Sequence, residues 1–343
     1  MALFHFDREQ KVYDIHGMQV GGQPGERPPL LIANMFQTKD KLVESRKPVR
    51  FDKVKAADRI KELEEISYAT GVPTLVGLVA PTADEMKAYT EFFLSVPNNL
   101  PFGIDSWTEK SRREAAQYVA ALGMQERFNY NSITAWDPDI ADQVAMLKEC
   151  GIQHIILQPF DMEDKHASGR MKSLKDMLAV VEPAGFHSIL IDTTTMNLPT
   201  HGICLLTNRM VKEELGYPAG NAPANASYMW RAALDKWGAE AFKGMDAGLH
   251  ALSAVMWQDW MVFGPMSGTR RIFTAVAAAT AILATMAWEE GSDLPDDPRH
   301  PLNLHFPQEV EMMKGMVEGK SDRIYKRQKE LKEKQQAATP VAN

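Results

Sequence analysis

The feature of this sequence that most constrains its fold is a repeating alternation of short apolar runs and longer segments with helical periodicity. The apolar runs cover residues 29–36, 73–80, 100–107, 127–133, 154–160, 187–193, 215–219 and 260–265. The helical segments that follow cover residues 53–71, 83–96, 111–123, 139–151, 171–185, 204–216, 225–238 with a continuation to 256, and 270–288. Strands that are apolar throughout are typical of a parallel sheet that helices cover.

Eight strand–helix units in one chain favour a closed (β/α)8 TIM barrel, an α/β fold that takes about 250 residues. The alternative is an open doubly wound sheet, but no G-x-G-x-x-G motif follows the first strand. Glycine is the residue most typical of helix C-termini. Five helices are expected to end at such a residue: Gly71, Gly123, Gly151, Gly185 and Gly216.

The chain divides into one large domain and a tail. Residues 1–301 hold the barrel, and the first 28 of them alternate around a His-Gly turn as a β-hairpin would. Residues 302–343 are expected to form a helical basic tail, because residues 320–334 carry seven basic and three acidic side chains. Such a segment is either a solvated helix or a docking element for an acidic partner or a neighbouring subunit.

Composition excludes several classes of function. The net charge of −7 argues against nucleic-acid binding, which needs clustered positive charge. The two cysteines, Cys150 and Cys204, predict reduced buried thiols rather than a disulfide or zinc site. The N-terminus is too charged for a secretory signal, and the longest apolar stretch, residues 273–288, is shorter than the roughly 20 residues of a membrane span. We therefore expect a cytoplasmic protein without a membrane span.

Polar side chains gather where the predicted strands end, which in a barrel is where ligands bind. They are Asn34, Asp105, Ser106, Asn131, Ser132, Gln158, Asp161, Asp192, Asn221 and Asn225. No cysteine or lysine shares these positions and His201 lies well into a loop, which argues against a tightly bound metal and against Schiff-base chemistry. Residues 264–271, GPMSGTRR, with Arg270 and Arg271 at a helix start, could instead hold a small anion.

Carboxylates and carboxamides in such a set suit a flat heterocycle. A carboxylate accepts two N–H bonds from an N–C–NH2 edge, and an Asn side chain both donates to and accepts from a neighbouring lactam. A pterin has both features. The alternative is that strand-end residues such as Asp105 and Asp192 only cap the helices that follow.

Five stretches of the chain together resemble one known family. They are FDREQKVYDIHGMQVGGQPGERP at residues 6–28, IDSW at 104–107, YNSI at 130–133, GYPAGNAPANASYMW at 216–230 and VFGP at 262–265. They resemble the H subunit of tetrahydromethanopterin S-methyltransferase and its soluble relatives, the methyltetrahydrofolate:corrinoid-protein methyltransferases. The soluble members from glycine betaine demethylation systems are the nearest match, over residues 4–301. Where family members have a glycine-rich loop, this chain has NAPAN.

This resemblance implies a pterin-binding barrel, related in architecture to dihydropteroate synthase, that moves a methyl group between N5 of a reduced pterin and the cobalt of a separate corrinoid (cobalamin) protein. By the family's pattern, Asp105, Asn131 and Asp192 hold the pterin. Asn225 matches the asparagine near N5, with Asn221 as a nearby competitor. Ser132 and Gln158 complete the expected pterin-binding set.

The expected function is therefore methyl transfer from a protein-bound methylcobamide to tetrahydrofolate, forming 5-methyltetrahydrofolate in a methylamine or betaine demethylation pathway. In the opposite direction, from N5 to Co(I), the cobalt is the nucleophile, so the enzyme needs none of its own. Two alternatives stay open: a methanopterin-linked subunit of a larger complex, and a pterin enzyme of the dihydropteroate synthase type. A homodimer is expected from family analogy alone.

Overall fold

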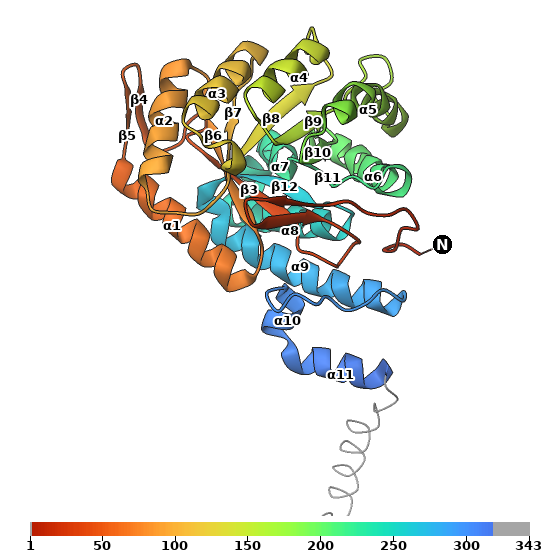
Figure 1. Cartoon of the computed structure of the whole chain (residues 1–343). Helices are drawn as coiled ribbons and strands as arrows, with labels where there is room; N and C mark the ends of the chain where they lie inside the picture. Colours follow the sequence, from red (N-terminus) through yellow and green to blue (C-terminus); the bar gives the residue numbers. More distant parts are fainter. Residues whose placement is uncertain (1, 318–343) are drawn as a thin grey trace, which may run out of the picture.

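The structure, a computed structural model, describes residues 2–317, and the structural statements below concern these residues. Eight parallel strands form a closed barrel in the spatial order β10-β11-β12-β3-β6-β7-β8-β9 (Figure 1). Their bounds are β3 Leu30–Met35, β6 Thr74–Val79, β7 Phe102–Asp105, β8 Phe128–Thr134, β9 His154–Gln158, β10 Ser188–Asp192, β11 Ala219–Asn221 and β12 Trp260–Pro265. The predicted (β/α)8 barrel is thus confirmed.

Helices surround the barrel on its outside (Figure 1). They are α1 Lys53–Thr70, α2 Ala83–Ser95, α3 Glu109–Ala121, α4 Ile140–Glu149, α5 Ala167–Val181, α6 Leu198–Glu214, α7 Pro223–Met229, α8 Arg231–Val255 and α9 Thr269–Glu289. Short 3-10 turns lie at Gln125–Arg127, Glu182–Ala184 and Met266–Gly268. The five glycines expected after helices all have positive φ, as helix ends require.

Three local features differ from the sequence-based expectation. The seventh strand is Ala219–Asn221 rather than residues 215–219, because Leu215 and Gly216 end α6. Helix α6 begins at Leu198, six residues earlier than expected, because Asn197 and Thr200 form a capping box that starts it there. An additional antiparallel hairpin, β4 Val43–Arg46 with β5 Val49–Phe51, was not predicted.

The predicted N-terminal hairpin closes one end of the barrel. It consists of β1 Val12–Ile15 and β2 Met18–Gly21 and lies across the barrel strands, dark red in Figure 1. Its buried side chains join an apolar cluster inside the barrel, made of Ile15, Val20, Leu30, Ile32, Leu75, Ile156, Leu190 and Trp260. The hairpin therefore covers the amino end of the barrel interior.

The apolar stretch in the last unit is a core helix of the barrel. The segment Met266–Glu289 has a mean hydropathy of 1.5 over its most apolar window, long and apolar enough by composition to cross a membrane. However, 56% of that window is buried inside the protein, as expected of a helix packed on a barrel.

The chain continues past the barrel as two short helices, α10 Pro301–His305 and α11 Pro307–Val317. Leu302, Val310 and Met313 pack against α9. The charged helix expected over residues 320–334 lies outside the described residues.

Candidate functional site at the barrel mouth

The residues expected from the sequence lie around the carboxyl end of the barrel, which we call the mouth. Asp105 is the last residue of β7 and pairs in register with Asn131 of the neighbouring strand β8. Asp192 ends β10, and Gln158 ends β9 between them. Ser132, buried beside Asn131, donates a hydrogen bond to Oε1 of Gln158 at 3.2 Å. Tertiary structure thus brings these five side chains to one end of the barrel.

The two aspartates at the mouth, Asp105 and Asp192, both have raised pKa values. Burial in the barrel wall raises the pKa of Asp105, although the Arg112 guanidinium opposes the rise. Burial also raises the pKa of Asp192 to about 7, and the charge of Asp105 adds to that rise, while the hydrogen bond from the Thr194 amide and the charge of Arg170 oppose it. Near neutral pH this pair therefore carries less than two full negative charges.

Asn221 and Asn225 have different environments. Asn221 is fully buried: its Nδ2 donates to Thr193 Oγ1 at 3.1 Å, and its Oδ1 accepts from Gln258 Nε2 at 3.1 Å. Asn225, in α7, is exposed, and its Nδ2 donates to the carbonyl oxygen of Thr195 at 3.4 Å. Of the two, Asn225 is the one whose side chain a ligand at the mouth can reach.

A short loop, Thr193–Thr195, connects the aspartate and asparagine halves of the site. The amide of Thr194 donates to Asp192 Oδ1 at 2.7 Å, and the carbonyl of Thr195 accepts from Asn225. Arg170, buried behind the loop, donates from Nε to the Thr193 carbonyl at 2.9 Å. His201 contacts Thr195 Oγ1 from the other side, so a buried framework surrounds the loop that contacts both Asp192 and Asn225.

One further polar residue, Asn34, lies at this end of the barrel next to a glycine. Gly77 of β6 pairs in register with Asn34 of β3, and a Cβ at Gly77 would lie 2.6 Å from Asn34 Oδ1. The absence of a side chain at residue 77 therefore makes room for the Asn34 carboxamide. Asn34 was recognised in the sequence as a strand-end residue, but it was not placed in the expected pterin-binding set.

An exposed apolar rim borders the mouth and was missed by the sequence reasoning. The rim consists of five side chains, each in the loop or helix that follows one of five successive strands, β7 to β11: Trp107, Trp136, Met162, Met196 and Met229. Their exposed fractions run from 54% to 78%. The signal in the sequence was a large apolar residue within about eight positions of each strand end.

The loop 264–271, expected to hold an anion, gives its two arginines other partners. Arg271 Nη2 donates to Asp246 Oδ2 at 2.6 Å, and Arg270 Nε donates to Glu62 Oε1 at 2.7 Å. With both guanidiniums engaged by carboxylates, the expectation of an anion site at this loop is not supported.

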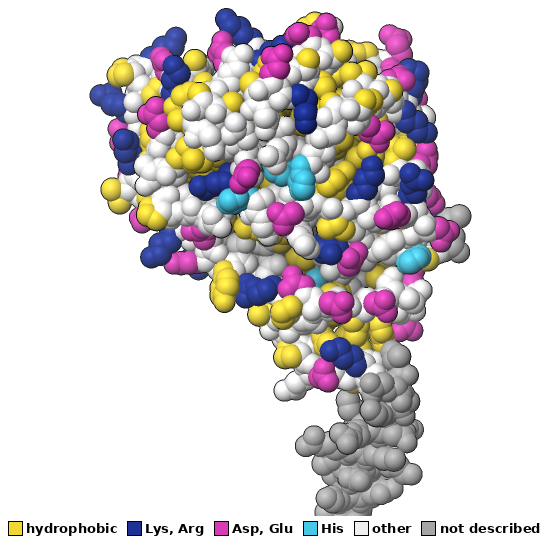
Figure 2. Space-filling view, in the orientation of Figure 1, with side chains coloured by type: hydrophobic (Ala, Val, Ile, Leu, Met, Phe, Trp, Pro, Cys, Tyr) yellow, Lys and Arg dark blue, Asp and Glu magenta, His cyan; other side chains and the backbone are white. Residues whose placement is uncertain are grey.

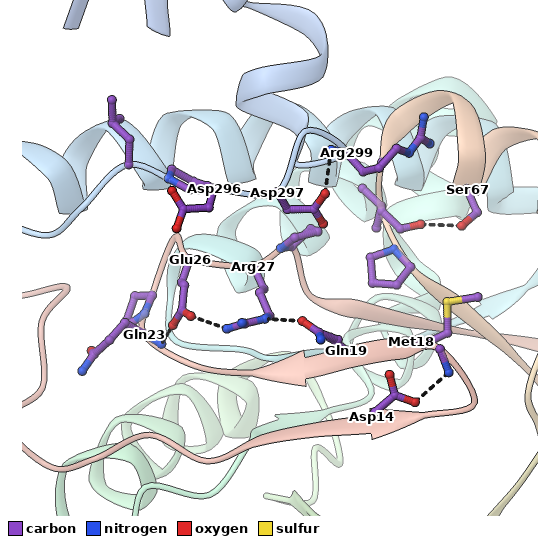
Figure 3. Close-up of a pocket in the computed structure, with 18 of the residues that line it drawn as sticks. Asp14, Met18, Gln19, Gln23, Glu26, Arg27, Ser67, Asp296, Asp297 and Arg299 are labelled. Carbon is purple, nitrogen blue, oxygen red and sulfur yellow. Dashed lines mark hydrogen bonds and ion pairs between the residues drawn. The ribbon is translucent and has the colours of Figure 1, made fainter. Parts of the chain in front are cut away.

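A large cavity lies at the opposite end of the barrel. It has a volume of about 1090 Å³ and is lined by the hairpin, the loop after it, the end of α1 and residues 291–299. Figure 3 shows that the Arg27 side chain bonds to Glu26 and Gln19 there and that the Asp297 carboxylate accepts a hydrogen bond from the backbone amide of Arg299. On the face shown in Figure 2, Lys and Arg side chains are scattered among Asp and Glu. Within residues 2–317, no group of three or more His, Cys, Asp or Glu side chains is arranged to hold a metal ion.

Fold and mouth together define a class of protein: a (β/α)8 barrel with carboxylates and carboxamides gathered at the carboxyl ends of its strands. The family model described as the tetrahydromethanopterin S-methyltransferase MtrH subunit matches residues 8–294, so this chain belongs to that family. The resemblance to this methyltransferase subunit inferred from the sequence is thereby confirmed.

Curated relatives match along nearly their whole length. The H subunit of tetrahydromethanopterin S-methyltransferase from Methanosarcina acetivorans is 29% identical over 314 residues, which cover 88% of this chain and 99% of the relative. The H subunit of a putative methyltransferase, mtx, from the same organism is 30% identical, covering 88% and 99%. The Methanocaldococcus jannaschii tetrahydromethanopterin S-methyltransferase H subunit is 31% identical, covering 84% and 96%.

Solved structures with the same fold include dihydropteroate synthases. The Yersinia pestis enzyme aligns with a TM-score of 0.55 at 12% identity, covering 79% of this chain and 99% of that one. The Xanthomonas albilineans enzyme aligns with a TM-score of 0.57 at 16% identity, covering 81% and 99%. At these identities the likeness establishes the barrel fold alone.

Proposed function

We propose that this protein is a methyltransferase that moves a methyl group between N5 of a reduced pterin and the cobalt of a corrinoid carried by a partner protein. The observation that carries the proposal is the arrangement of Asp105, Asp192 and Asn225 around one mouth. Two carboxylates there suit the N–C–NH2 edge of a pterin, and the amide is available for the reacting nitrogen. Membership of the MtrH family supports the same reaction class.

The role of Asn225 follows from the orientation of its amide. Its Nδ2 donates to the Thr195 carbonyl, which leaves Oδ1 as the atom that can face a ligand. An amide oxygen cannot deliver a proton, but it stabilises positive charge that develops at N5 as the methyl group is exchanged. This is electrostatic stabilisation of the transition state by a preorganised dipole.

For the pterin itself, we propose tetrahydromethanopterin rather than the tetrahydrofolate expected from the sequence. The support is the set of curated relatives, several of which are named as the H subunit of tetrahydromethanopterin S-methyltransferase. The same names support the alternative that this chain works as a subunit of a larger assembly. The expected betaine pathway, cytoplasmic location and homodimer have no such support.

A corrinoid partner has a suitable place to dock. Cobalt must come within bonding distance of the methyl group, so the partner must cover the mouth during transfer. The apolar rim is a set of exposed large side chains of the kind that marks protein interaction sites. We therefore place the corrinoid protein on the rim, with its cobalt facing Asn225.

The decisive experiment is a spectroscopic methyl-transfer assay that pairs methylcobalamin with the unmethylated pterin, or cob(I)alamin with the N5-methylated pterin, using tetrahydromethanopterin and tetrahydrofolate in parallel. Transfer with either pterin that depends on Asn225 supports the reaction, and the pterin with the higher kcat/KM identifies the substrate. A folded protein that binds a pterin yet transfers no methyl group with either one would exclude the proposal. The dihydropteroate synthase alternative needs a diphosphate grip, and the arginines of residues 264–271 are already engaged.

A further inference from the structure

Asn225 lies on a helix too short to hold its own position. Helix α7 has seven residues, Pro223–Met229, and isolated helices of this length are unstable in water. The contact between Asn225 Nδ2 and the Thr195 carbonyl is long, at 3.4 Å. Contacts elsewhere on α7 must therefore determine where the Asn225 amide lies.

The strongest of these contacts is made two residues after Asn225. Ser227, fully buried, donates from Oγ to Asp246 Oδ1 of α8 at 2.6 Å. Asp246 is itself fully buried, so its carboxylate needs compensation within the protein. A charge-assisted hydrogen bond of this length is stronger than a bond between two neutral groups.

Arg271 supplies the compensating charge. It reaches from α9 and donates to Asp246 Oδ2 from Nη2 at 2.6 Å and from Nε at 3.2 Å. The same Nη2 lies 3.4 Å from the hydroxyl of Tyr228, the next residue of α7. Ser227, Asp246 and Arg271, which we call the latch, thus join α7 to two helices of the barrel wall.

A glycine allows α7 to approach the barrel closely enough for this. A Cβ at Gly264 of β12 would lie 3.0 Å from Cβ of Ala224, the residue before Asn225. Gly264 also has a φ of +81°, which a side chain would strain. The strand and the latch therefore fix α7 from two sides.

We propose that Asp246 is a positioning residue for the methyl transfer: with Arg271 it holds Ser227, and through α7 it keeps the Asn225 amide oxygen directed at N5. This inference rests on the proposed function, and it assigns a role to Arg271, the residue that the sequence suggested for anion binding. The latch acts on the reacting group without touching pterin or corrinoid.

The test compares Ser227→Ala and Asp246→Asn with a matched control, Arg270→Met. Arg270 neighbours Arg271 on α9, but its partner is Glu62 and its side chain is 77% exposed. Each variant is assayed for methyl transfer and for pterin affinity, alone and combined with Asn225→Ala. Hydrogen exchange of residues 223–229 is measured by mass spectrometry on the same proteins.

The expected result is specific to positioning. Ser227→Ala and Asp246→Asn should lower the rate on the order of 10- to 100-fold, the effect of misplacing a reacting group by about 1 Å. They should leave pterin affinity within about threefold and speed exchange in α7, while Arg270→Met changes none of these. In the Asn225→Ala background, Ser227→Ala should lower the rate no further, because both substitutions act by removing the same interaction, that between the Asn225 amide and N5.

Three outcomes would overturn the proposal. Unchanged exchange in α7 would show that the latch does not hold the helix, and that result says nothing about the methyl transfer. Additive losses in the Asn225→Ala background would show that the effect bypasses Asn225. A parental rate for Asn225→Ala alone would reject the proposed role of Asn225, and the latch with it. Should Asp246→Asn fail to fold, Ser227→Ala, which leaves the ion pair intact, carries the test.

Discussion

Asp192 lies close enough to Asp105 across the barrel mouth for the charge of Asp105 to raise the pKa of the Asp192 carboxyl. Burial raises the pKa of Asp192 to about 7, and the charge of Asp105 adds to the rise. The site therefore changes its charge in the physiological pH range, and two predictions follow from that change.

Pterin binding should depend on pH. If the carboxylate form of Asp192 accepts the N–H groups of the pterin, apparent affinity rises as Asp192 loses its proton. Between pH 6 and pH 8 the deprotonated fraction of a group with a pKa near 7 grows about tenfold, and the affinity should follow. Calorimetric titrations in buffers of different ionisation enthalpy will measure this dependence and the accompanying proton release. Asp192→Asn should abolish both, and tighter binding at low pH would contradict the assignment.

Asp192 should also reduce the stability of the empty protein at high pH. Its folded pKa, about 7, lies above the value near 3.8 of an unperturbed aspartate, so the folded state binds the proton more tightly. The free energy of unfolding therefore falls as pH rises from about 4 to 7. Asp192→Asn should be more stable than the parent by on the order of 1–3 kcal/mol at pH 8 and equal to it below about pH 4. Urea denaturation at the two pH values, followed by circular dichroism, gives both numbers.

Asn225→Ala should impair chemistry more than binding. Removal of one preorganised dipole costs about 2–4 kcal/mol in the transition state, so kcat should fall at least a hundredfold while pterin affinity changes little. Asn221→Ala is the informative comparison, since it leaves the buried Thr193 and Gln258 without a shared partner. That variant should lower stability, seen as a lower Tm. Equal kinetic effects of the two variants at equal Tm would argue against the distinction drawn between them.

The apolar rim should matter only when the corrinoid is delivered by a protein. Charged replacements, Trp136→Glu with Met162→Glu, should raise the KM for a corrinoid protein at least about tenfold, because they place charge in an apolar contact. The reaction with dissolved methylcobalamin should be unaffected. Leu206→Glu, on the outer surface of α6 and 56% exposed, controls for a general effect of added charge. A loss of activity with dissolved methylcobalamin would place these residues in the site itself.

A buried ion pair should hold helix α6 to the start of β12. Lys212 Nζ lies 2.8 Å from both carboxylate oxygens of Asp259 and 2.9 Å from the Gly22 carbonyl. Lys212→Met should destabilise the fold by about 3–5 kcal/mol, because Asp259 would be left as an unpaired buried charge. Lys175→Met breaks an exposed pair with Glu214 and should cost less than about 1 kcal/mol. Similar losses for both would show that Asp259 becomes protonated or hydrated when its partner is removed.

The site residues show most clearly what could be predicted from the sequence and what could not. Asp105, Asn131, Gln158 and Asp192 were each placed at a strand end from apolar patterning, and all four lie at the mouth. The family pattern favoured Asn225 over Asn221, but it could not show that Asn221 is buried, since β11 has only three residues and gives too little periodicity to orient a side chain. The partners of Arg271 were equally hidden, because Asp246 lies 25 positions away on another helix.

The sequence by itself determined the eight-unit barrel, the hairpin that closes it and the helix-ending glycines, because side-chain periodicity and local backbone preference act over a few residues. Tertiary structure alone decided the rest: a pKa near 7 for Asp192, a buried Asn221 beside an exposed Asn225, and a rim assembled from five separate segments. These properties depend on desolvation and on distances between residues remote in the chain. Desolvation and these distances are set only when the barrel has folded and brings the remote segments together.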